Sequence, residues 1–105
     1  MDPFKPYQAK AKILTAKSLS NEGAEAVALQ AVAYVVGDEE LRERFMAASG
    51  SDLEDLKRRI TQRNFLVGVL DFLLADESAV VSFAEHGQFA PETTMLARAR
   101  LASAT

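Results

Sequence analysis

Two side chains of this 105-residue chain have the chemistry of an acid–base site. His86 is the only histidine, and imidazole is the side chain whose ordinary pKa lies near neutrality. Asp71 stands inside the most apolar stretch, where burial would raise the pKa of a carboxyl group. Catalysis needs a second group within reach, but Glu85 is the only acid beside His86 and nothing suitable adjoins Asp71. We therefore predict no catalytic residues and no enzyme.

Both residues have structural explanations. His86 precedes Gly87 at the end of a predicted helix, where a cation is favoured by the helix dipole. Asp71 belongs to a narrow stripe of small or polar residues along its helix, which we interpret as the side that faces solvent. The alternatives are a buried acceptor for Arg98 or a tyrosine hydroxyl, and a functional acid in a pocket. A stripe of this kind would also let another helix or a partner approach closely. Its members, at intervals of four, three and four, are Asn64, Gly68, Asp71 and Ala75.

The sequence also lacks the motifs that would indicate a metal site, a cofactor or a catalytic nucleophile. With no cysteine, the chain has no disulfide, cysteine-based zinc or iron–sulfur site, or thiol nucleophile. It contains no P-loop, dinucleotide fingerprint or calcium loop, and its serines lack the context of a nucleophile elbow. We predict no metal site and no cofactor.

A basic cluster raises the possibility of nucleic-acid binding. The helices before and after residue 50 could form a helix-turn-helix, but the reading helix would then begin with Asp52, Glu54 and Asp55. Glu54 and Asp55 are also spaced for ion pairs with the bases four residues later. We therefore expect a solvated helix face, and salt-resistant binding through these bases would contradict that interpretation. The cluster comprises Lys57, Arg58, Arg59 and Arg63.

Charge divides the chain into two parts. Residues 1–20 hold four lysines and one aspartate, a net charge of +3, whereas residues 21–105 hold eight basic and fourteen acidic residues, a net charge of −6. We predict a flexible basic N-terminal tail over 1–20, able to bind anionic surfaces, and a single helical domain over 21–105. The tail lacks the apolar stretch of a secretory signal, and the longest apolar run, 65–75, is only eleven residues and contains Asp71. We predict a cytoplasmic protein without a membrane span.

The spacing of apolar residues and caps predicts an all-α fold, a compact bundle of about six short helices. Gly37 is expected to end the first helix in a left-handed conformation, and Ser51 and Glu54 are expected to form a capping box for the third. The fourth helix is apolar nearly all round, which marks it as the central one. The helices are expected near 22–36, 39–49, 53–60, 64–75, 76–87 and 91–101.

The same patterns predict which side chains are buried. In the first helix, one apolar stripe contains Ala24, Val27, Ala28, Ala31, Tyr34 and Val35. The expected core residues are Phe45, Leu56, Ile60, Phe65, Val69, Leu70, Phe72, Leu73, Phe83 and Leu101.

An internal repeat is also visible. A shift of 38 residues places Asp38-Glu39 on Asp76-Glu77, Phe45 on Phe83, and 27–36 on 65–74 with mostly apolar matches. The chain could therefore contain two pseudo-repeated three-helix units. The alternative is that small helical proteins reuse the same caps and stripes. Two units are too few for a solenoid, which favours a closed bundle or a dimer.

These residues carry a resemblance to a known family. Ala-Val-Ala-Leu-Gln-Ala at 26–31, Asp-Glu-Glu-Leu-Arg-Glu-Arg-Phe at 38–45 and Val-Leu-Asp-Phe-Leu-Leu-Ala-Asp-Glu at 69–77 are followed by Phe83 and Pro91. Together they resemble the bacterial family called domain of unknown function 3572, over about residues 22–101. The resemblance implies a small helical cytosolic protein and transfers no catalytic residue.

We therefore predict a non-catalytic protein-interaction or adaptor module, with an unknown protein partner or self-association through an alanine-rich helix face. The alternative is a nucleic-acid-associated accessory protein that uses the basic cluster and the N-terminal lysines.

Overall fold

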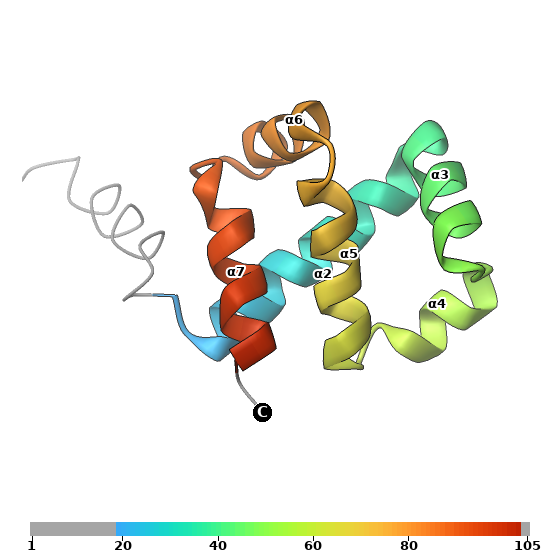
Figure 1. The fold of residues 1–105 in the computed structure, drawn as a ribbon, viewed down its shortest axis with the longest axis horizontal. Helices are drawn as coiled ribbons and strands as arrows, with labels where there is room; N and C mark the ends of the chain where they lie inside the picture. Colours follow the sequence, from blue (N-terminus) through green and yellow to red (C-terminus); the bar gives the residue numbers. More distant parts are fainter. Residues whose placement is uncertain (1–18, 104–105) are drawn as a thin grey trace, which may run out of the picture.

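The computed structural model describes residues 19–103, and this part of the chain is an all-α bundle of six helices (Figure 1). The predicted tail is outside the described residues, apart from Leu19 and Ser20. Leu19 is buried and the Ser20 hydroxyl accepts from the Gly23 amide, so both belong to the packed domain. The helices are α2 (Asn21–Gly37), α3 (Glu39–Ser49), α4 (Leu53–Arg59), α5 (Arg63–Leu74), α6 (Glu77–Gly87) and α7 (Glu92–Ser103).

Two helices share the centre of the bundle. As predicted, α5 is central and packs against α2, α6 and α7. The longer helix α2 passes behind α5 and α7 and packs against α3, α5, α6 and α7 (Figure 1). By contrast, α4 has no comparably extensive contact with any other helix of the described part. It lies at one end of the molecule with α3 (Figure 1).

The core confirms most of the predicted buried residues. Tyr34, Ile60 and Phe72 are the exceptions: all three pack against the core but are only half-buried, because they border surface hollows. Fully buried alanines occur in both α2 and α7, where small side chains let helices approach closely. The predicted residues that are buried are Ala24, Val27, Ala28, Ala31 and Val35 of α2, together with Phe45, Leu56, Phe65, Val69, Leu70, Leu73, Phe83 and Leu101.

Two of the predicted helix ends are wrong in detail. Gly37 is still helical, and Asp38, with an extended backbone, ends α2 and caps α3 by accepting from the Leu41 amide. The capping box lies one residue later than predicted and joins Asp52 to Asp55. Ser51 cannot serve as the cap because it is buried and its hydroxyl accepts from Arg59.

The structure supports the repeat. Helices α3 and α6 have the same length and begin and end 38 residues apart. Asp38 and Asp76 cap them, and the residues that follow them, Gly50 and Gln88, are both left-handed. The halves also exchange equivalent ring contacts. Tyr34 of α2 packs on Phe83 of α6 at 5.4 Å between centroids, and Phe72 of α5 packs on Phe45 of α3 at 5.2 Å. The first two helices of each unit are thus related in packing as well as in sequence.

Candidate functional site

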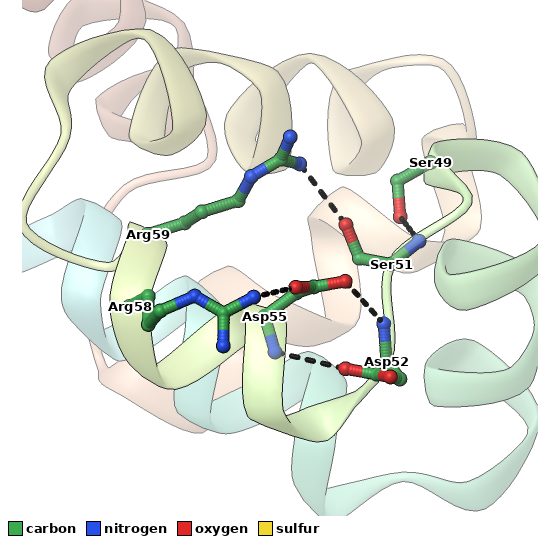
Figure 2. Close-up of polar contacts among 6 residues, drawn as sticks. All are labelled: Ser49, Ser51, Asp52, Asp55, Arg58 and Arg59. Atoms are coloured by element: carbon green, nitrogen blue, oxygen red, sulfur yellow. Dashed lines mark hydrogen bonds and ion pairs between the residues drawn. The ribbon is translucent and has the colours of Figure 1, made fainter.

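The basic cluster lies on α4 and at the start of α5, and its α4 members all have polar contacts, of which Figure 2 shows those of Arg58 and Arg59. Arg58 forms an ion pair with Asp55, and Lys57 Nζ lies 3.8 Å from a Glu54 carboxylate oxygen. Arg59 Nη1 donates to the Ser51 hydroxyl at 3.0 Å. The two ion pairs on α4 thus join residues three apart, whereas the predicted pairs were four apart. Arg59, the predicted partner of Asp55, instead reaches back to Ser51 in the turn before α4.

This arrangement favours the interpretation of a solvated helix face. The first turn of α4 is acidic. Each of the three basic residues of α4 contacts a carboxylate or a hydroxyl within residues 51–59. Arg63 opens α5 and also has an interaction. No contact on the described residues favours nucleic-acid binding by this cluster.

Asp71 is on the solvent side of α5, as we expected, with all four members of its stripe exposed. Its side chain is 49% exposed, so the alternative of a buried acceptor is wrong, although Arg98 was the right partner. Arg98 Nε donates to Oδ1 at 2.8 Å and Nη2 to Oδ2 at 3.4 Å. The hydrogen bond to Asp71 and the charge of its carboxylate raise the pKa of the Arg98 guanidinium. The pair links α5 to α7 at the surface.

The structure does not bring Asp71 and His86 together. Asp71 lines a hollow of about 560 Å³ between α3 and α5, whose floor includes Gly68 and Phe72. His86 lies in the last turn of α6, as predicted, and lines a separate hollow of about 220 Å³ beside α2, with Tyr34 and Asp38. Within residues 19–103, no group of three or more metal-ligating side chains is placed to hold an ion.

A third hollow is more apolar than these two. It is a groove of about 470 Å³ between α2 and α4, with charged residues only at its rim, where Glu54 and Lys57 face solvent. Leu29 stands on its α2 wall with 45% of its surface exposed. The sequence contained a signal for this groove, because Leu29 is a large apolar residue outside the predicted buried stripe of α2. The residues that line it are Leu29, Val32, Ala33, Val36, Glu54, Leu56, Lys57 and Ile60.

The face of α2 that borders this groove is small and uncharged. Its exposed residues correspond, by the shift of 38, to the narrow stripe on α5. On α5 that stripe contains Asp71, which pairs with Arg98; on α2 the corresponding residue is Ala33. The exposed α2 residues that correspond to the α5 stripe are Ala26, Gln30, Ala33 and Gly37.

Comparison with known proteins agrees with the sequence resemblance. A family model described as a protein of unknown function (DUF3572) matches residues 21–104. No curated protein and no solved structure matches the chain. Among the described helices, none has the length and apolar character needed to cross a membrane.

Proposed function

The chain belongs to the DUF3572 family of proteins of unknown function, and we propose that it is a non-catalytic protein-interaction module, working in the cytoplasm. The observation that carries the proposal is the groove between α2 and α4, with Leu29 45% exposed at its wall. Exposed large apolar side chains that adjoin an apolar groove are typical of protein-binding surfaces.

The shape and chemistry of the groove suit one class of partner. Two helices form its walls, and its lining is aliphatic apart from the rim residues Glu54 and Lys57. An amphipathic helix can lay its apolar face into such a groove, with anchors three or four residues apart. The partner's contact face would be uncharged, because Ala33 and Val36 offer no group to pair with a buried charge.

The proposal is tested by capture from native cells with three forms of the full-length chain as bait. Leu29→Asp places a charge in the groove, and Met95→Asp is the matched control, since Met95 is a 56% exposed apolar residue on α7. We expect a protein that binds the wild type and Met95→Asp but not Leu29→Asp. Its binding should also slow hydrogen exchange in α2 and α4.

Two results would contradict the proposal. One is the absence of any protein that distinguishes the two variants. The other is binding that slows exchange only in helices away from the groove. A copy of the same chain counts as a partner, so self-association is included in the assay.

A further inference from the structure

The groove between α2 and α4 exists because α4 is shorter than its counterpart. In the second half of the chain, the twelve residues of α7 pack against α5, and Leu70 of α5 is fully buried. In the first half, α4 has only seven residues, and Val32, the counterpart of Leu70, remains half-buried. A side of α2 that the repeat would cover with a helix is therefore open.

The contacts at the equivalent positions differ in chemistry as well. On α5 the position in question is Asp71, and its partner on α7 is Arg98. By the shift of 38, the residues that correspond to Asp71 and Arg98 are Ala33 on α2 and Ile60 after α4. Both line the groove. Water solvates the two charges of an exposed ion pair, whereas exposed apolar side chains gain free energy when they are covered. The open side of α2 thus has the chemistry of a contact surface.

The open side of α2 has both an exposed apolar side chain and a groove that could receive it. Leu29 projects at one wall of the groove, and the groove next to it is lined by aliphatic side chains of similar size. Two copies related by a two-fold axis could each insert Leu29 into the groove of the other, which is an isologous interface. Ala33 and Gly37 would let the two α2 helices cross at close range, because neither has a bulky side chain.

The charges also permit a second copy. Two domains that each carry a net charge of −6 over residues 21–105 repel one another least when they meet through faces with few acids. From Ala26 to Gly37, α2 has no charged residue. At the rim, Glu54 and Lys57 supply one charge of each sign, so a second copy meets an opposite charge in either orientation.

We infer that the groove between α2 and α4 binds a second copy of this chain, α2 against α2, with Leu29 of each copy in the groove of the other. The inference rests on the proposed function and names its partner. The contact spans about three turns of one helix and the adjoining groove, which is small for a protein interface. Association is therefore weak and depends on concentration.

The absence of cysteine allows a direct test with the full-length chain. In Ala33→Cys, the new thiol lies at the proposed crossing point, and mild oxidation should yield disulfide-linked dimers. The matched control is Ala99→Cys: Ala33 and Ala99 are both exposed and both lie four residues before a helix end. We expect at least tenfold less dimer for Ala99→Cys at equal concentration. Equal yields from the two variants would overturn the inference.

Sedimentation equilibrium gives a second measurement without any new thiol. We expect the wild type and Ala99→Arg to form dimers with the same dissociation constant, and Ala33→Arg to dimerise roughly a hundredfold less well. The reason is that the two-fold axis would bring two arginines together. A wild type that stays monomeric at every concentration, or a dimer that Ala33→Arg leaves intact, contradicts the inference. The capture experiment remains a separate test of the proposed function.

The groove could instead be occupied by residues 1–18 of the same chain. Two measurements distinguish this possibility from a second copy. The net charge of residues 1–18 is +3, so docking onto the acidic domain would weaken as salt is raised, whereas association of two like-charged copies should be unchanged or stronger. The thiol of the Ala33→Cys variant should react freely with an added reagent at low protein concentration and become protected at high concentration. Protection at every concentration would assign the groove to residues 1–18 and refute the second copy.

Discussion

The two halves of the domain begin alike and end differently. In each half an aspartate caps a short helix that carries one phenylalanine, and a left-handed residue ends that helix. The third helix then diverges: α7 packs against α2, α5 and α6, whereas α4 makes no comparable contact within the described part. Phe83 is fully buried in the second half, and its counterpart Phe45 borders a hollow.

We infer from this difference that the second half contributes more to the stability of the fold, whereas the first half provides the surface for binding. The second half buries side chains of both α5 and α7, including Leu70 and Leu101. The first half leaves hollows on both sides of α4 and an uncharged helix face beside one of them. We expect substitutions in the second half to affect mainly folding, and substitutions on the open face of α2 to affect mainly binding.

The largest effect expected from this comparison is at the two equivalent phenylalanines. Phe83→Ala should lower the free energy of unfolding by about 3–5 kcal/mol, because a fully buried ring leaves a cavity. Phe45→Ala should cost less, since the side chains around the hollow can move into the space. Urea unfolding of both variants measures the two losses. Equal losses, or a larger one for Phe45, would mean that the halves contribute equally to stability.

The sequence was sufficient to predict the parts of the fold that depend on local patterns. The six helices and most of the core follow from spacing and residue type. The errors are at positions where tertiary contacts decide the outcome. Ser51 has the chemistry of a cap, but a side chain eight residues away, Arg59, takes its hydroxyl, and Asp52 caps α4 instead.

The candidate site was less predictable for the same reason. Exposure of the stripe containing Asp71 follows from the pattern of α5, and Arg98 could be named as a partner by charge alone. The groove depends on how far α4 extends along α2, which no local pattern specifies. Leu29 was the available signal, a large apolar residue off the buried side of α2, and the length difference between α4 and α7 explains its exposure.

The next prediction concerns buried polar groups in the first turn of α7. The hydroxyls of Thr93 and Thr94 are buried without a hydrogen-bond partner in the described structure. The counterpart of Thr94 in the first half is Leu56, which is buried and apolar. Thr94→Val keeps the shape and removes the unsatisfied hydroxyl, so it should raise the free energy of unfolding by about 1–2 kcal/mol.

Thr61→Val is the control for this change, because Thr61 is exposed and its substitution should be close to neutral. Both are measured by urea unfolding. A loss of stability in Thr94→Val would show that its hydroxyl is hydrogen-bonded in solution, and the contrast with Leu56 would then disappear.

A smaller effect is expected where the two halves use different residues in one backbone conformation. Gly50 has φ 72° and Gln88 has φ 61°, and each ends its helix. Left-handed backbone is unfavourable for residues with a Cβ atom, so Gln88→Gly should stabilise the domain by about 1 kcal/mol. The reciprocal Gly50→Gln should destabilise it by a similar amount, since a Cβ there meets no neighbouring atom and the loss is purely conformational. Thermal unfolding of both variants should show opposite shifts, and shifts of the same sign would contradict the equivalence.

The smallest effect is a dependence on pH at the start of α6. The Ala79 amide and the Arg44 guanidinium, whose nitrogen lies 3.3 Å from a carboxylate oxygen, hold the pKa of Asp76 below its ordinary value of 3.8. A carboxyl group with a lowered pKa in the folded state adds stability above its unfolded pKa and loses that contribution as the pH falls through the folded value. The difference in stability between wild type and Asp76→Asn should therefore be greatest near neutral pH and shrink below about pH 4.

The second variant, Arg44→Ala, divides this effect between its two causes. It removes the ion pair from α3 but leaves the amide of Ala79, the larger cause, in place. In the Arg44→Ala background, the pH-dependent difference caused by Asp76→Asn should become smaller without vanishing. If it vanished, the ion pair from the first half would be the main stabiliser of the Asp76 carboxylate. If it were unchanged, Asp76 would act as a cap alone, and this charge contact between the halves would add nothing to stability.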